Sequence, residues 1–75
     1  MSPRREQALR LLADHGVEGA KGAELQPNGW GGFLATVEGD TYNVSLDAYP
    51  KATVEKVLDS TRLGIRQVEQ LKPLT

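Results

Sequence analysis

The sequence predicts a small two-layer α+β domain in the order helix, three-stranded antiparallel sheet, helix (α-β-β-β-α). Three observations predict this fold class. Apolar residues recur at helical spacing in residues 2–15, alternate with polar residues in 33–46, and recur at helical spacing in 50–72. Both helices can cover the one apolar face of such a sheet. The 75 residues suffice for one domain spanning positions 1–75.

The first helix is predicted over residues 2–15. Ser2 can cap its first turn, and Pro3 suits the first helical position because the missing N–H has no partner there. Gly16 is a natural end, and we expect His15 before it to bond the last carbonyls rather than to catalyse. The helix buries an apolar stripe made of Ala8, Leu9, Leu11 and Leu12.

The strongest signal in the chain is a β-hairpin over residues 33–46. It follows a predicted loop at 17–20 and a weak strand at 21–26, which we place at a sheet edge. A two-residue turn at Gly39-Asp40 pairs Val37 with Tyr42 and sorts the side chains into a buried and a wet face. The buried face collects Phe33, Ala35, Val37, Tyr42, Val44 and Leu46.

Residues 50–72 predict the second helix, with Pro50 at its start and Pro73 as its stop. The alternative breaks the chain at Gly64 and makes residues 65–71 a fourth strand, but "IRQVEQL" does not alternate cleanly. Leu63 points away from the helical stripe, and the helix does not explain it. The stripe consists of Val54, Val57, Leu58, Thr61, Ile65, Val68 and Leu71.

Composition limits the function. The chain has no Cys and one His, so disulfides, thiolate sites and His-cluster metal sites are excluded. A net charge of −1 argues against binding to nucleic acid through overall electrostatic attraction. The sequence shows no enzyme motif, no membrane span and no signal peptide, so we expect a cytoplasmic protein without catalytic activity, cofactor, metal or membrane partner. A core this small favours binding to a larger protein or to itself.

The loop before the hairpin is the candidate binding site. It runs Asn28-Gly29-Trp30-Gly31-Gly32 and holds the only Trp of the chain. In one interpretation Trp30 folds back over the sheet end and closes the core, and in the other it is an exposed anchor for a partner. The residues predicted to bind a partner are Asn28, Trp30, Gly31 and Leu34.

We therefore expect a protein-binding or regulatory module (an adaptor, inhibitor, antitoxin or phage-type modulator) that acts through a sheet edge and the Trp30 loop. Its partner is another protein or a second copy in a homodimer. One alternative is an enzyme subunit whose site is completed in an oligomer. The other is a nucleic-acid-binding domain in which bases stack on Trp30 beside a local basic patch of Arg4, Arg5, Lys51, Arg62 and Arg66.

Overall fold

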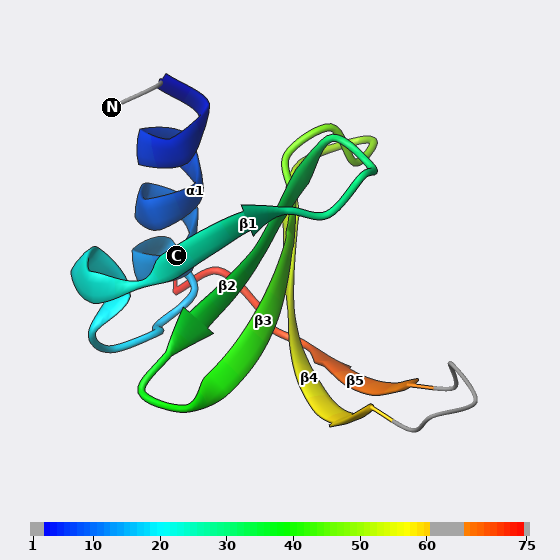
Figure 1. Ribbon diagram of the computed structural model, residues 1–75. Coiled ribbons are helices and arrows are strands. Elements are labelled where there is room, and N and C mark those ends of the chain that lie inside the picture. The colour runs from blue at the N-terminus through cyan, green and yellow to red at the C-terminus, as the bar shows by residue number, and fades with distance from the viewer. Residues whose placement is uncertain (1–2, 61–65, 75) are drawn as a thin grey trace.

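The computed structural model describes residues 3–60 and 66–74, and within these ranges the chain forms one α-helix and a five-stranded antiparallel sheet (Figure 1). The strands follow one another across the sheet in chain order. The predicted order of helix, three strands and helix is therefore wrong, because a single helix packs on a larger sheet. The elements are α1 (Pro3–Asp14), the 3-10 helix η1 (Ala20–Gly22), β1 (Glu24–Pro27), β2 (Gly32–Val37), β3 (Asp40–Ser45), β4 (Thr53–Ser60) and β5 (Arg66–Gln70).

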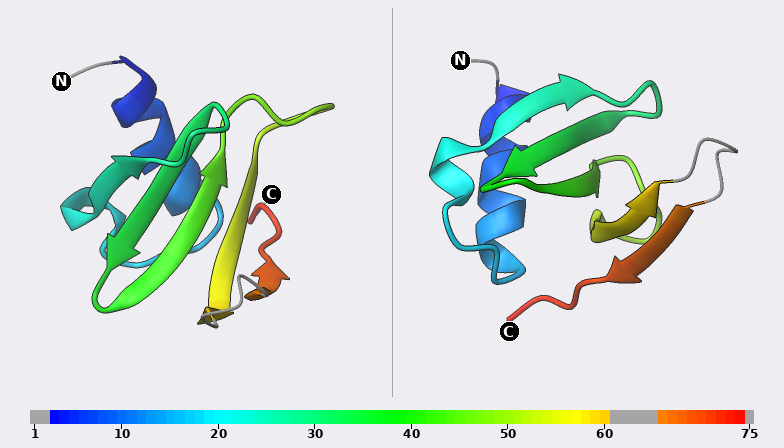
Figure 2. Two further views of the ribbon diagram at one scale, coloured as in Figure 1. Left: turned by 45° about the vertical axis from the view of Figure 1, so that its right-hand side comes forward. Right: turned by 60° about the horizontal axis from the view of Figure 1, so that its bottom comes forward.

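The hydrophobic core lies between α1 and one face of the sheet (Figures 1 and 2). Its largest fully buried side chains are Leu12 of α1, Val44 of β3 and Val54 of β4. The predicted inner face of the hairpin is confirmed, since all six of its members are buried. In the part of the chain that the structure describes, the other buried apolar residues are Ala8, Val17 and Ala20.

The end of α1 was predicted correctly because its signal is local. Gly16 has a φ of +82°, and its N–H donates to the carbonyl of Ala13 at 3.0 Å. The N–H of Val17 donates to the carbonyl of Leu12 at 3.1 Å. These two bonds form a Schellman motif, in which the residue after the glycine also makes an apolar contact with the helix. Val17 and Leu12 are both buried and supply that contact.

The hairpin of β2 and β3 turns one residue earlier than predicted. Its central residues are Glu38 and Gly39, with φ values of +50° and +87°, and Val37 pairs with Asp40 rather than with Tyr42. Positive φ at both central positions is the pattern of a type I′ turn, which suits the twist of a hairpin. Moving the turn by one residue changes each cross-strand pair by two positions, so the predicted faces survive while the predicted pairs do not.

The predicted edge strand is confirmed as β1, although it begins at Glu24 because η1 occupies Ala20–Gly22. β1 lies at one edge of the sheet and pairs with β2.

The predicted second helix is wrong, because its residues form β4 and β5, a further antiparallel hairpin. Val54 lies on the inner face opposite Val44, whereas Val57 pairs with Thr41 on the outer face. The apolar stripe is thus divided between two faces of a sheet. β-branched residues fit a strand well, and β4 satisfies the backbone groups that β3 would otherwise leave unpaired.

The alternative of a fourth strand at 65–71 is closer to the structure, since β5 spans Arg66–Gln70. Gly64 and Leu63, on which that choice was argued, lie outside the described residues. The hairpin of β4 and β5 points away from α1 (Figure 2). Because β5 is the last strand in the order β1-β2-β3-β4-β5, it forms the second edge of the sheet.

Candidate functional site

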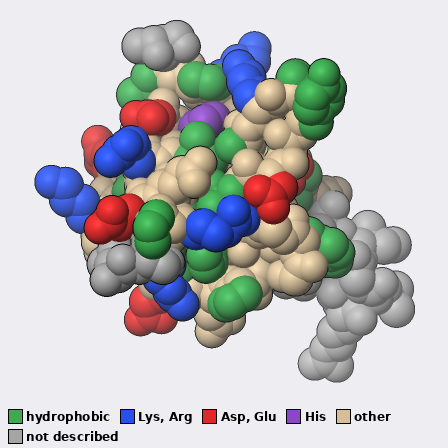
Figure 3. Space-filling view, turned by 90° about the horizontal axis from the view of Figure 1, so that it is seen from above, with side chains coloured by type: hydrophobic (Ala, Val, Ile, Leu, Met, Phe, Trp, Pro, Cys, Tyr) green, Lys and Arg blue, Asp and Glu red, His purple; other side chains and the backbone are tan. Residues whose placement is uncertain are grey.

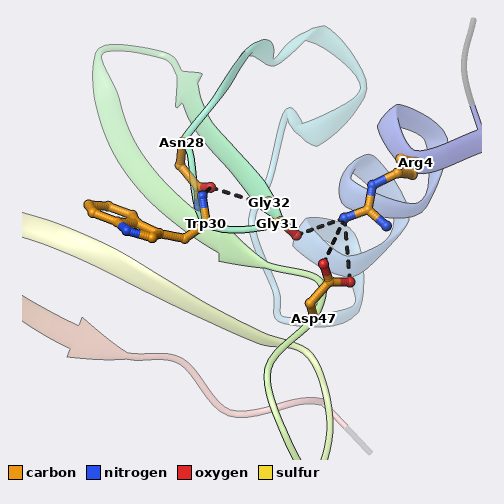
Figure 4. Close-up of polar contacts among 6 residues, drawn as sticks. All are labelled: Arg4, Asn28, Trp30, Gly31, Gly32 and Asp47. Atoms are coloured by element: carbon orange, nitrogen blue, oxygen red, sulfur yellow. Dashed lines mark hydrogen bonds and ion pairs between the residues drawn. The ribbon is translucent and has the colours of Figure 1, made fainter.

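Trp30 lies in the connection between β1 and β2, which we call the Trp30 loop (residues 28–31). Its side chain is 76% exposed, so the indole is not part of the core. This exposure excludes the interpretation in which Trp30 closes the core. Trp30 does not close the core; it projects from the loop (Figure 4).

Asn28 fixes the shape of the Trp30 loop. Its Oδ1 accepts hydrogen bonds from the N–H of Trp30 at 2.8 Å and from the N–H of Gly32 at 3.1 Å (Figure 4). Its own N–H donates to the carbonyl of Gly32 at 3.1 Å, and its Nδ2 donates to Oδ1 of Asn43 in β3 at 2.9 Å. An Asn side chain that accepts from the backbone two residues ahead is a turn-forming arrangement. The backbone of Trp30 is held in place as a result.

Arg4 ties the loop to the rest of the protein. Its Nη2 donates to the carbonyl of Gly31 at 2.8 Å and lies 3.3 Å from Oδ2 of Asp47 (Figure 4). Asp47 belongs to the connection between β3 and β4. One guanidinium therefore joins the first turn of α1 to both loops at this end of the sheet. Half-exposed ion pairs of this kind contribute about 0–1 kcal/mol, so we assign Arg4 a positioning role.

The two glycines after Trp30 are required by close approach. Gly31 has a φ of +78°, and a Cβ there would overlap the carboxylate of Asp47. A Cβ at Gly32 would overlap the carbonyl oxygen of Val44. Glycine is the residue that permits such conformations and contacts. Gly31 and Gly32 thus mark two close approaches of the Trp30 loop to neighbouring segments.

A second exposed aromatic residue, Tyr49, lies in the β3–β4 connection and is 96% exposed. No role for Tyr49 was predicted from the sequence. Its loop and the Trp30 loop touch where Asp47 meets Gly31, and both lie at the same end of the sheet (Figure 1). This end of the molecule therefore presents two aromatic side chains to solvent on adjoining loops.

Leu34 is half-buried and lies on the outer face of β2, opposite the core. It pairs with Asn43, the residue that binds the side chain of Asn28. Asn43 also donates to Oε1 of Glu55 in β4 at 3.3 Å. Leu34 is therefore close to the base of the Trp30 loop through its strand partner, but it does not extend the exposed aromatic surface.

Among the described basic residues of the nucleic-acid alternative, Arg4 and Arg5 make separate contacts within the protein. Arg4 is paired with Asp47, and Nη1 of Arg5 donates to the carbonyl of Leu25 at 3.3 Å. The Arg5 guanidinium also lies 5.5 Å from the ring centroid of Phe33. Basic and acidic side chains are interleaved on the face seen in Figure 3. Lys51 lies in the β3–β4 connection, where it lines a pocket with Asp14, Arg66 belongs to β5, and Arg62 falls outside the described residues.

Lys51 lines a pocket of about 460 Å³ near the C-terminal end of α1. His15 also lines this pocket and is 9% exposed. Its Nδ1 donates to the carbonyl of Leu11 at 2.8 Å. This is the bond to a late helical carbonyl that the sequence predicted. Asp14 lines this pocket, and it lies ten positions along α1 from Arg4. The helix therefore places the pocket about 15 Å from Arg4, at 1.5 Å per residue.

In residues 3–60 and 66–74, no three His, Cys, Asp or Glu side chains group as metal ligands do.

Sequence-based prediction singled out Asn28, Trp30 and Gly31 because they stand together in one loop around the only Trp. It missed Arg4 as the residue that positions the loop, and it missed Asp47, because these contacts join positions 27 and 43 residues apart. It also missed Tyr49, because the only sign in the sequence that this side chain is exposed is its position in a loop next to Pro50.

No protein-family model matches the chain, and the searches of curated proteins and of solved structures find no match either. Among the helices formed by the described residues, none has the length and apolar character needed to span a membrane.

Proposed function

We propose that this chain is a protein-binding module without catalytic activity of its own, and that Trp30 is its anchor. The single observation that carries the proposal is a Trp that is 76% exposed on a loop held by side chains from α1, β3 and the β3–β4 connection. The cytoplasmic location expected from the sequence remains part of this proposal.

The exposed indole can contribute substantial binding energy. A Trp side chain buries roughly 150–250 Å² in a protein interface or core. Covering the exposed 76% of that area gives about 3–5 kcal/mol at roughly 25 cal/mol per Å². Interface hot spots rich in Trp and Tyr lose about 2–4 kcal/mol on truncation to Ala, which agrees with this magnitude.

The fixed loop lowers the cost of binding. A partner that orders a flexible side chain or loop loses roughly 0.5–1.5 kcal/mol for each group that it immobilises. The backbone on both sides of Trp30 is already held, by Asn28 at one end and by Arg4 at Gly31. Tyr49 on the adjoining loop can widen the contact, since it is 96% exposed. We assign the sheet-edge contact to a different part of the molecule, β5.

The charged groups favour this function over the nucleic-acid alternative. A single-stranded nucleic acid needs cations along its backbone as well as an aromatic platform. The cation nearest to the Trp30 loop is Arg4, and its charge is paired with Asp47. No observation among the described residues favours the enzyme-subunit alternative.

The test is affinity purification from lysate of the source cell with the wild-type chain, Trp30→Ala and Leu74→Ala as baits. Leu74 is a matched control, because it is 72% exposed and bonds Asp14 at the opposite end of α1. A partner captured by the wild type is purified and titrated against all three proteins. We expect Trp30→Ala to raise Kd by about 30-fold or more, with little salt dependence, and Leu74→Ala to leave it unchanged.

Equal affinity of Trp30→Ala and wild type for the purified partner contradicts the proposal. A parallel titration uses a single-stranded oligonucleotide at about 50 mM salt, where binding that falls steeply with added salt supports the nucleic-acid alternative instead.

A further inference from the structure

The free edge of β5 is a second candidate surface for binding a partner. The N–H of Leu71 donates to the carbonyl of Val54 at 3.0 Å, so the backbone of Leu71 faces β4. Backbone groups of successive residues in an antiparallel strand point to alternate sides. Those of Val68 and Gln70 therefore point away from β4, at an edge against which no other described strand lies.

The two edges of the sheet differ in their protection. β1 contains Pro27, and the carbonyl of Leu25 is bonded by Arg5. Proline and side chains that cover the backbone are common means of blocking an edge. β5 contains no proline, and Val68 at its centre is 43% exposed.

The sequence of β5 fits a second copy of itself. In an antiparallel pair with its two-fold axis at Val68, Val68 lies opposite the partner's Val68 and Gln67 lies opposite the partner's Glu69. All five residues of β5 are then paired, and no like charges face each other across the axis. A register centred on Glu69 places that carboxylate opposite the partner's Glu69, which is destabilising.

The outer face of the sheet supports the same register. Val57 of β4 is the cross-strand neighbour of Val68, and it is half-buried. Pairing at Val68 joins these side chains into a row that runs Val57, Val68, the partner's Val68, the partner's Val57. Cross-strand pairs of β-branched residues stabilise antiparallel sheets.

We propose that β5 pairs with β5 of a second copy of this chain, in antiparallel register centred on Val68, so that two sheets join into one. The partner is identified by the self-complementary register and the apolar row, and neither depends on Trp30. The dimer carries two Trp30 loops. A contact made by one pair of five-residue strands is below about 1,200 Å², the class of weak interfaces.

The test measures molar mass by sedimentation equilibrium over a range of protein concentration. For a weak dimer with a Kd of about 10 μM to 1 mM, the mass rises with concentration from 8.2 kDa toward twice that value. Val68→Lys places two cations opposite each other and is expected to raise the dimer Kd by at least tenfold. Thr36→Lys is the matched control, because Thr36 is exposed on the outer face of β2 in the sheet interior, and it dimerises like the wild type.

Gln70→Pro provides a second variant in case Val68→Lys does not fold. It removes one N–H from the free edge and none from the ladder with β4, and proline is tolerated at such positions. Trp30→Ala is expected to dimerise like the wild type, which separates this proposal from the proposed function. A wild-type mass that stays at 8.2 kDa at every concentration, or equal dimer Kd values for the wild type, Val68→Lys and Gln70→Pro, overturns the proposal.

Discussion

Replacing Asn28 by Ala removes the side chain that shapes the Trp30 loop. The substitution deletes the bonds that Oδ1 accepts from Trp30 at 2.8 Å and Gly32 at 3.1 Å, and the bond donated to Asn43 at 2.9 Å. Each bond contributes about 0.5–1.5 kcal/mol net. Water can replace the exposed bond at Trp30, so the two part-buried bonds dominate and the expected loss is about 2 kcal/mol. For a domain of this size, that lowers Tm by about 8–16 °C.

The matched control is Asn28→Asp. A carboxylate keeps both bonds accepted from the backbone and loses only the bond donated to Asn43, so Asp should cost less than Ala. Urea unfolding followed by far-ultraviolet circular dichroism measures both, because an indole that is exposed in the native state reports unfolding poorly. An Asn28→Ala variant within about 0.5 kcal/mol of the wild type, the scatter of ordinary surface substitutions, would refute the role assigned to Asn28.

Three further substitutions and one control test the fold. Gly32→Ala should destabilise by about 1–3 kcal/mol in urea unfolding, because its Cβ overlaps the carbonyl of Val44, whereas Gly22→Ala, with open space, should stay neutral. Glu38→Asn should raise stability by about 1 kcal/mol, because Asn tolerates the positive φ of this turn better; a lower Tm would contradict the turn assignment. Leu12→Ala should cost about 2–5 kcal/mol, and a loss below about 1 kcal/mol would show that Leu12 is not in the core.

The parts of the fold that the sequence predicted correctly are those whose signals are local. Gly16 ends α1 through bonds to residues within five positions, and the alternation in 33–46 identifies both faces of the β2–β3 hairpin. The exact pairing was missed because two neighbouring turn positions give the same faces. Only the conformations of Glu38 and Gly39 distinguish them.

The β4–β5 hairpin was missed because the spacing of its apolar residues fits a helix as well as a strand. Val54, Val57 and Leu58 fit one side of a helix, yet in the sheet Val54 faces the core and Val57 the outer face. What decides between the two is the pairing of β4 with β3, an interaction between segments that periodicity within either segment does not reveal.

The candidate site was predicted in part for the same reason. The loop around Asn28 and Trp30 was singled out because it holds the only Trp of the chain. The exposure of Trp30 could not be predicted, because the contacts of Arg4 with Gly31 and Asp47 that fix the loop join residues far apart in the sequence.

The most direct test of the account is acrylamide quenching of Trp30 fluorescence in the free monomer, compared with N-acetyltryptophanamide in the same buffer. Trp30 is the only Trp, so the signal comes from this side chain alone. With the indole 76% exposed, we expect a quenching constant close to that of the free fluorophore and an emission maximum near it. A blue-shifted emission that acrylamide hardly quenches would show that Trp30 closes the core, and it would contradict the anchor on which the proposed function rests.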